Sequence, residues 1–427
     1  MTNPAFNWKI DPADYEDAES ARLADEVSKY FVSRRLKYLD VAGIGGHGGA
    51  LVLREDDENG RPIRKIVVKY SVSEEADQDL RTEAQCLELL RGAEHIVQMI
   101  PLAQTDLNIS GTGKRPTLAL EFVPHGTARA FLQKLQRNGT RLPSRMLWSI
   151  LLCLSRQLTA MAYPPQGEEN APVSPELLKP TERPLGLTQN SCHLANLLIG
   201  DLSPESWEHF FVPIFKLIDF GRGLVHPNVL SAMEANIYGA GFMIMSLAAP
   251  EIPAEYHFGD WRGTENWYDP KATPDAIYPV TTCAHEAFLQ RQDLDPLLQD
   301  IIVRMLSRLH DDKPNIFELV HTCEWAVAYR RLEDFDNDGL DAAAKHRESD
   351  EWIREFIRST ILDADVIGGP LEHERKIQDS QLGTTLTGGM YKNIGQTITF
   401  VNRTDGATKH ETAAAEEPTQ THESDVD

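Results

Sequence analysis

Residues 43–50 read GIGGHGGA, and this glycine-rich stretch decides which fold the sequence predicts. It matches the pattern G-x-G-x-x-G, which two different nucleotide-binding folds use. In a dinucleotide-binding fold, a helix follows the glycines. Here residues 49–56 read GALVLRED, which is a strand pattern, so the sequence predicts a strand, a glycine turn and a second strand. The Asn59-Gly60 pair then predicts a hairpin turn before a third strand that ends near Tyr70.

Lys69 ends the apolar run IVVK at residues 66–69. An ammonium group in such a setting needs a carboxylate partner, because burying an unpaired charge is costly. Residues 77–91 predict an amphipathic helix with Leu80 and Leu87 on its apolar face. Glu83 lies on the same face, so we expect it to point inward and to pair with Lys69.

The order and spacing of these and later motifs resemble the eukaryotic protein kinase family over residues 39–326. The resemblance implies an α+β, bilobal fold, with a small antiparallel-sheet lobe that carries one helix and a larger helical lobe. The stretches that carry it are GIGGHGGA (the glycine-rich loop), IVVK (the lysine strand), LALEFVPHG at 118–126 (the hinge), CHLANLLI at 192–199 (the catalytic loop), LIDFG at 217–221 (the D-F-G strand) and residues 297–320 (the closing helices).

The resemblance implies ATP and Mg²⁺ as ligands. Leu120 takes the gatekeeper position, and the backbone from Glu121 to Val123 is implied to contact adenine. Asn196 and Asp219 offer the hard oxygen ligands that Mg²⁺ prefers. The residues implied to bind or support the nucleotide are Gly43, Gly45, Gly48, Ala50, Lys69, Glu83, Leu120, Glu121 and Val123.

The position of the catalytic base departs from the family pattern. Family spacing is H-R-D-x-x-x-x-N, so the base should lie five residues before Asn196, where this chain has Ser191. A serine does not accept a proton near neutral pH as a carboxylate does, and a general base contributes roughly 10²–10⁴-fold to a rate. His193, two residues further on, is the alternative proton acceptor.

The segment after Asp219 is also unusual. Residues 235–251 are interpreted either as a buried helix or, through Ala249-Pro250-Glu251, as the A-P-E motif of the family. We prefer the helix, because a nearly continuous apolar run does not suit an exposed loop. Only residues 220–235 then remain for an activation segment, which predicts a reduced surface for docking a peptide substrate.

The rest of the chain divides by composition and periodicity. We expect an N-terminal helical extension at 1–38 (Leu23, Val27 and Phe31 at helical spacing), a small lobe at 39–124, a large lobe at 125–330, a C-terminal helical extension at 331–367 and a disordered acidic tail at 368–427.

Residues 95–100 and 117–123 predict strands, and residues 143–163 a helix. Asp295 and Pro296 predict the start of another helix, whose apolar face includes Leu309. Residues 164–184 and 201–213 are interpreted as inserted loops.

Composition limits the class of protein. The formal net charge is −23, so we expect neither nucleic acid nor an anionic membrane as a partner. No stretch predicts a signal peptide or a membrane span. The five cysteines are scattered, which favours reduced thiols in the cytoplasm or nucleus and argues against a structural zinc site. We interpret Cys192 as a packing residue, and His47, His95 and His125 as surface or turn residues rather than ligands.

Three functions are compatible with these observations. The first is a pseudokinase, a regulatory or scaffolding module that binds ATP and Mg²⁺ with negligible phosphotransfer. The second is a weak or atypical kinase that acts on protein Ser/Thr and tolerates Ser191 or uses His193. The third is a small-molecule phosphotransferase resembling aminoglycoside or choline kinases, which lack a peptide-docking loop; the helices at 297–320 argue against this one.

Overall fold

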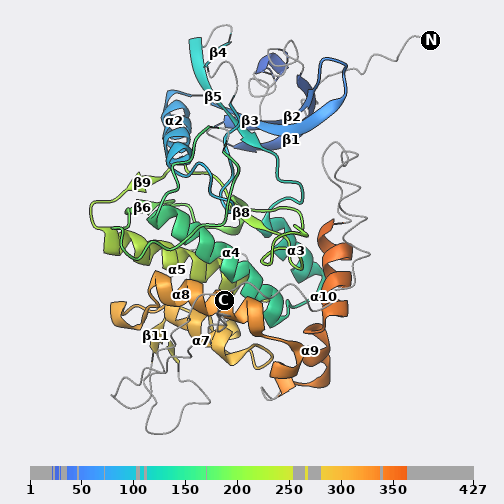
Figure 1. The fold of residues 1–427 in the computed structure, drawn as a ribbon, viewed down its shortest axis with the longest axis vertical. Coiled ribbons are helices and arrows are strands. Elements are labelled where there is room, and N and C mark those ends of the chain that lie inside the picture. Colours follow the sequence, from blue (N-terminus) through green and yellow to red (C-terminus); the bar gives the residue numbers. More distant parts are fainter. Residues whose placement is uncertain are drawn as a thin grey trace, which may run out of the picture. The chain divides into compact units, whose positions relative to one another are not determined.

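An antiparallel sheet of five strands forms the first part of the chain in the computed structural model (Figure 1). Its strands are β1 (Leu36–Gly45), β2 (Gly48–Asp56), β3 (Pro62–Ser71), β4 (Asp106–Ile109) and β5 (Gly113–Glu121), in the order β1-β2-β3-β5-β4. Between β2 and β3, the Asp57 carboxylate accepts the N–H groups of Asn59 and Arg61, both at 2.8 Å, and Gly60 has φ +76°. The three predicted strands and the turn at Asn59-Gly60 are confirmed, whereas residues 46 and 47 lie outside the described residues.

The structure describes residues 22, 25–27, 29, 36–45, 48–71, 73–101, 106–109, 113–169, 171–252, 265–267, 280–336 and 340–362. All of them belong to one compact unit of the chain, residues 1–267 and 280–384. Residues 22, 25–27 and 29 are helical, and Val27 is fully buried. Leu23, Phe31, His47 and the predicted tail at 368–427 lie outside the described residues.

Helix α2 (Glu74–Leu89) packs against β3 and β5. It begins three residues before the predicted start, because the Ser73 hydroxyl caps it by accepting the Ala76 N–H at 3.1 Å. Leu80, Glu83 and Leu87 are buried on one face, as the periodicity predicted.

The prediction of a strand at residues 95–100 is wrong. This segment makes only isolated bridges, from Ile96 to Leu217 and from Met99 to Leu120. The segment is apolar because it is buried against two different strands, β5 and β8, and not because it forms a strand itself. The strand that pairs with the outer side of β5 is β4, whose four-residue sequence DLNI was not predicted as a strand.

Helices form most of the second part of the chain (Figure 1). Helix α4 (Ser144–Ala162) is buried along its length and packs against α5 (Val229–Ala248) and α8 (Ile316–Tyr329), and α5 also packs against α7 (Pro296–Met305). The predicted helix at 143–163 is confirmed, and so is the Asp295 cap of α7. Leu309 was placed wrongly, because α7 ends at Met305 and Leu309 is 55% exposed. No helix in the described part of the chain is both long and apolar enough to cross a membrane.

The choice between a helix and a loop at residues 235–251 is settled in favour of the helix. Helix α5 starts at Val229, where the Asn228 side chain accepts the Ser231 N–H at 3.2 Å, and Ala249-Pro250-Glu251 follow its end. Residues 220–228 alone separate Asp219 from this helix, so the intervening segment is shorter than predicted.

The remaining elements are short. The paired strands are β6 (Leu187–Thr188) with β9 (Leu224–Val225), β7 (Leu197–Ile199) with β8 (Phe215–Leu217), and β10 (Glu265–Trp267) with β11 (Val280–Thr282). The other α-helices are α3 (Ala128–Asn138), α6 (Glu286–Leu289), α9 (Ala342–Arg347) and α10 (Asp350–Ile357). Among the described residues of 164–184 and 201–213 there are turns but neither helix nor strand, as predicted for loops. The architecture is mixed α+β, with an antiparallel sheet in the first part of the chain and mostly helices in the second.

Candidate functional site

Lys69 and Glu83 form the ion pair that the sequence predicted, with Glu83 buried and Lys69 partly buried. Lys69 lies on β3, opposite Ala50 of β2 and Leu118 of β5, and Glu83 lies on the buried face of α2. The Lys69 Nζ is 2.6 Å from Glu83 Oε2 and 2.8 Å from Oε1. Glu83 is 2% exposed, so its carboxylate holds the ammonium in one place.

Asp219 brings a second carboxylate to the same ammonium. It follows β8, and its Oδ1 is 3.7 Å from Lys69 Nζ. Its side chain is 44% exposed, so this carboxylate is open to solvent or to a ligand, unlike that of Glu83. Asp219 has φ +63°, a backbone conformation that costs energy for a residue with a side chain and that concentrates at functional sites.

The two carboxylates decide the charge of Lys69. Burial disfavours the ammonium, but the attraction of Glu83 and Asp219 is stronger and raises the pKa of Lys69 above its usual value. Lys69 therefore stays protonated throughout the physiological pH range. A fixed ammonium beside an accessible carboxylate is suited to bind a phosphate together with its metal counter-ion.

Asn196, Ser191 and His193 form a second group beside Asp219. Asn196 ends the 3₁₀ turn Leu194–Asn196, and the Ile218 N–H donates to its carbonyl at 2.9 Å. The Asn196 Nδ2 donates to Ser191 O at 3.0 Å and to Ser191 Oγ at 3.2 Å. Ser191 Oγ is 3.3 Å from His193 Nε2. These hydrogen bonds of Nδ2 fix the orientation of the Asn196 amide, so its oxygen Oδ1 points away from Ser191.

Gln189 joins these two groups, and sequence reasoning did not find this role. Its side chain is fully buried, and its Nε2 donates to Ile218 O at 3.0 Å and to Asp219 O at 2.8 Å. Its Oε1 accepts the Ser191 N–H at 2.8 Å. Gln189 thereby links the turn that carries Ser191 to the backbone of Asp219. The only available signal was a long amide side chain two residues before Ser191.

The glycine-rich stretch lies on the same sheet as Lys69. Gly43 pairs with Ala50 across β1 and β2, and Gly48 pairs with Ser71 of β3. A Cβ at Gly48 would lie 2.1 Å from Tyr70 O, whereas a Cβ at Gly43 would meet nothing within 4 Å. Gly48 is therefore required by packing within the protein, and Gly43 is not.

The residues implied for the hinge follow β5. Leu120 is 4% exposed and lies opposite Val67 on β3. The Glu121 Oε1 accepts from Lys216 Nζ at 2.7 Å and from the Gln98 N–H at 2.9 Å, so this side chain has a structural partner that sequence reasoning missed. Val123 is 8% exposed.

The histidine and cysteine predictions have mixed outcomes. His95 and His125 lie in turns, as expected, but neither is a surface residue, because both side chains are 0% exposed. The Nε2 of His125 is 2.8 Å from Asp201 Oδ1. Cys192 packs against the core, as interpreted, and burial raises the pKa of its thiol to about 12.

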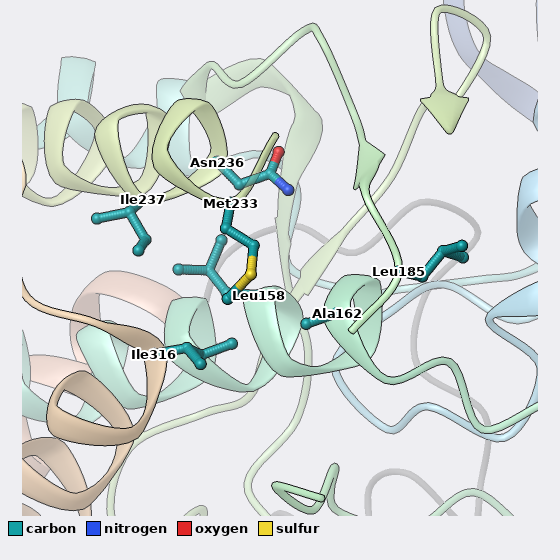
Figure 2. Close-up of a pocket in the computed structure, with 7 residues that line it drawn as sticks. All are labelled: Leu158, Ala162, Leu185, Met233, Asn236, Ile237 and Ile316. Atoms are coloured by element: carbon teal, nitrogen blue, oxygen red, sulfur yellow. The ribbon is translucent and has the colours of Figure 1, made fainter. Parts of the chain in front are cut away.

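A small pocket lies elsewhere, among α4, α5 and α8 (Figure 2). It is lined by Leu158, Ala162, Leu185, Met233, Asn236, Ile237 and Ile316. Asn236 is the polar member, and its Nδ2 donates to Leu187 O at 2.8 Å. None of the predicted nucleotide or metal residues lines this pocket, whose volume of about 10 Å³ has room for about one water molecule.

No protein-family model matches the chain, and no curated protein matches it. Function is therefore inferred from the geometry of the site. Lys69 offers a fixed cation, and Asp219 and Asn196 offer a carboxylate oxygen and an amide oxygen, which are hard ligands suited to Mg²⁺. These groups fit a phosphate ester with a bound divalent cation.

Proposed function

We propose that the chain is a pseudokinase: a bilobal, protein-kinase-like domain that binds ATP with Mg²⁺ and has negligible phosphotransfer activity. The observation that carries this proposal is the position of Lys69 Nζ, 2.6 Å from Glu83 and 3.7 Å from Asp219. These residues come from β3, from α2 and from the segment after β8, and their meeting at one ammonium matches what the motif order implies.

Each residue has a role in this proposal. Lys69, held by Glu83, binds the α- and β-phosphates, and Asp219 and Asn196 hold the metal that neutralises them. The backbone of the glycine-rich stretch, including Gly43 and Gly45, covers the phosphates. Leu120 and the backbone from Glu121 to Val123 line the adenine end.

The low turnover in this proposal follows from Ser191. A hydroxyl at the position of the base does not take a proton from an acceptor near neutral pH, although positioning and charge neutralisation remain. The protein would then act through its nucleotide-bound conformation, as a regulator or scaffold.

One observation favours a second candidate, a weak or atypical protein Ser/Thr kinase. Ser191 Oγ is 3.3 Å from His193 Nε2, so an imidazole adjoins the residue that the resemblance assigns to the position of the base. Burial lowers the pKa of His193, and the attraction of Asp219 only partly opposes this, so the ring is neutral and able to accept a proton at pH 7. Transfer of radiolabelled phosphate that is lost in both Asp219→Asn and His193→Ala would favour this candidate.

The proposal predicts that ATP with Mg²⁺ stabilises the protein and that Lys69→Met removes most of this effect. A ligand at 100 times its dissociation constant stabilises by about 2.7 kcal/mol. Methionine keeps the length of the side chain but removes the charge that binds the phosphates. The measurement is the shift of the thermal unfolding midpoint on adding ATP and Mg²⁺, determined for each variant against its own nucleotide-free midpoint.

Lys179→Met is the matched control, because Lys179 is 37% exposed and pairs with Glu182, three residues further along the chain. The control should respond to ATP as the wild type does. Absence of any response in the wild type, or an equal response in Lys69→Met, would overturn the proposal.

A further inference from the structure

Three side chains of the types that bind metal ions meet in the interior of the described part of the chain. His95 lies in the turn after α2, Cys153 in the middle of α4 and His209 in the loop at 201–213. One nitrogen of each imidazole and the Cys153 Sγ all lie within 4.8 Å of one another. His95 and Cys153 are fully buried and His209 is 2% exposed, so solvent does not compete for these atoms.

The geometry of the two histidines is close to that of a zinc site. The Nε2 atoms of His95 and His209 face each other at 2.9 Å, and the ring centroids are 5.0 Å apart with the planes tilted by 56°. Two nitrogens bound to one tetrahedral zinc at about 2.0–2.1 Å are separated by about 3.3 Å. An opening of a few tenths of an ångström between the rings would admit the ion.

A carboxylate fixes His95 in the orientation that a metal ligand needs. The Nδ1 of His95 is 2.7 Å from Glu176 Oε2, and the His95 N–H donates to Glu176 Oε1 at 2.8 Å. With Nδ1–H donated to the carboxylate, Nε2 carries the lone pair and faces the Nε2 of His209. Metal-ligating histidines are commonly held in this way by a carboxylate on the other ring nitrogen.

A fourth ligand is available next to His209. Glu208 Oε2 is 3.9 Å from His95 Nε2, and Glu208 is 4% exposed. Glu208 now pairs with Arg156, at 2.6 Å from its NH2 group, and Arg156 has a second carboxylate partner in Glu324 at 2.8 Å. Glu208 can therefore turn one oxygen toward a cation without leaving Arg156 unpaired.

We propose that His95, Cys153 and His209, with Glu208 as the fourth ligand, bind a structural zinc ion. Two nitrogens, a thiolate and a carboxylate form a closed tetrahedral set with no position left for a substrate, which is typical of structural rather than catalytic zinc. On binding, the Cys153 thiol gives up its proton to solvent. The ion would fasten the loop at 201–213 to α4 and to the turn after α2. This site is independent of the proposed nucleotide function.

The test is the metal content of the full-length protein and its response to cobalt. We expect about one zinc ion per chain by mass spectrometry. After chelation, titration with Co²⁺ should give the near-ultraviolet charge-transfer absorption of a thiolate–cobalt bond. Cys153→Ser should lose this absorption. Cys323→Ser should retain it, because Cys323 is equally buried but its Sγ is 3.6 Å from Ser155 Oγ rather than beside a histidine.

His209→Gln is the second variant. Because His209 lies on a loop, this substitution leaves α4 unchanged. It should keep the circular dichroism spectrum of the wild type and lose the metal, and it decides the question if Cys153→Ser fails to fold. A wild type that binds neither zinc nor cobalt would overturn the proposal and leave a metal-free hydrogen-bonded histidine pair. The proposal would also be overturned if the cobalt spectrum were unchanged in Cys153→Ser or in His209→Gln.

Discussion

Replacing Ser191 with aspartate is expected to raise ATP turnover by roughly 10²–10⁴-fold over the wild type. Ser191 Oγ already lies beside the proposed metal ligand, 3.2 Å from Asn196 Nδ2, so a carboxylate introduced there would be positioned to accept a proton. The other residues of the proposed site, which include Lys69 and Asp219, are unchanged in this variant. The measurement is phosphate release from ATP in the presence of Mg²⁺.

Two controls make this result specific to the site. Ser231→Asp adds the same charge at the exposed start of α5 and should leave turnover unchanged. Adding Asp219→Asn to Ser191→Asp should abolish the gain, because the metal is no longer held. If Ser191→Asp binds ATP as the wild type does but gains no turnover, the missing base is not the reason for low activity.

Replacing Asp295 with alanine is expected to destabilise the fold by about 3–5 kcal/mol, the usual cost of removing one member of a buried ion pair. Asp295 is 1% exposed. Its carboxylate accepts the Trp148 indole N–H at 2.8 Å, lies 2.8 Å from Arg330 NH2 and caps α7 at the Leu297 N–H. Alanine removes these contacts and leaves the Trp148 donor buried without this acceptor. Urea unfolding followed by tryptophan fluorescence measures the change.

Asp295→Asn is the matched control. The amide keeps the shape and one oxygen, which can still cap α7 at the Leu297 N–H. Its NH2 group replaces the oxygen that accepts the Trp148 N–H, and the charge that attracts Arg330 is lost. We therefore expect a loss of stability between that of the wild type and that of Asp295→Ala. Equal unfolding midpoints for the wild type and Asp295→Ala would show that the carboxylate does not stabilise the fold through Trp148, Leu297 and Arg330 as described.

The Lys69–Glu83 pair could be predicted because each partner has a local signal. A lysine in an apolar strand needs a counter-charge, and the helical period placed Glu83 on the same face as Leu80 and Leu87. The contact to Asp219, at 3.7 Å, was not contained in any local pattern. It was expected only because the motif order resembles a family in which the two meet.

Other contacts could not be predicted, because they join residues that are far apart in the sequence. Glu176 lies 81 residues after His95, and His209 lies 114 residues after it. The proposed zinc site likewise has no signal in the cysteine spacing, because its ligands are one thiol and two histidines that are far apart in the sequence. The strand predicted at 95–100 failed for a related reason: an apolar run indicates burial, and burial does not require pairing in a sheet.

The proposed function requires that Lys69 and Asp219 bind one nucleotide and its metal together. Its most direct test is calorimetric titration of ATP, with and without Mg²⁺, into the wild type and Asp219→Asn. We expect Mg²⁺ to tighten ATP binding to the wild type and to have little effect on Asp219→Asn, whose metal ligand is lost. An equal effect of Mg²⁺ on both proteins, or no binding of ATP to the wild type, would contradict the claim.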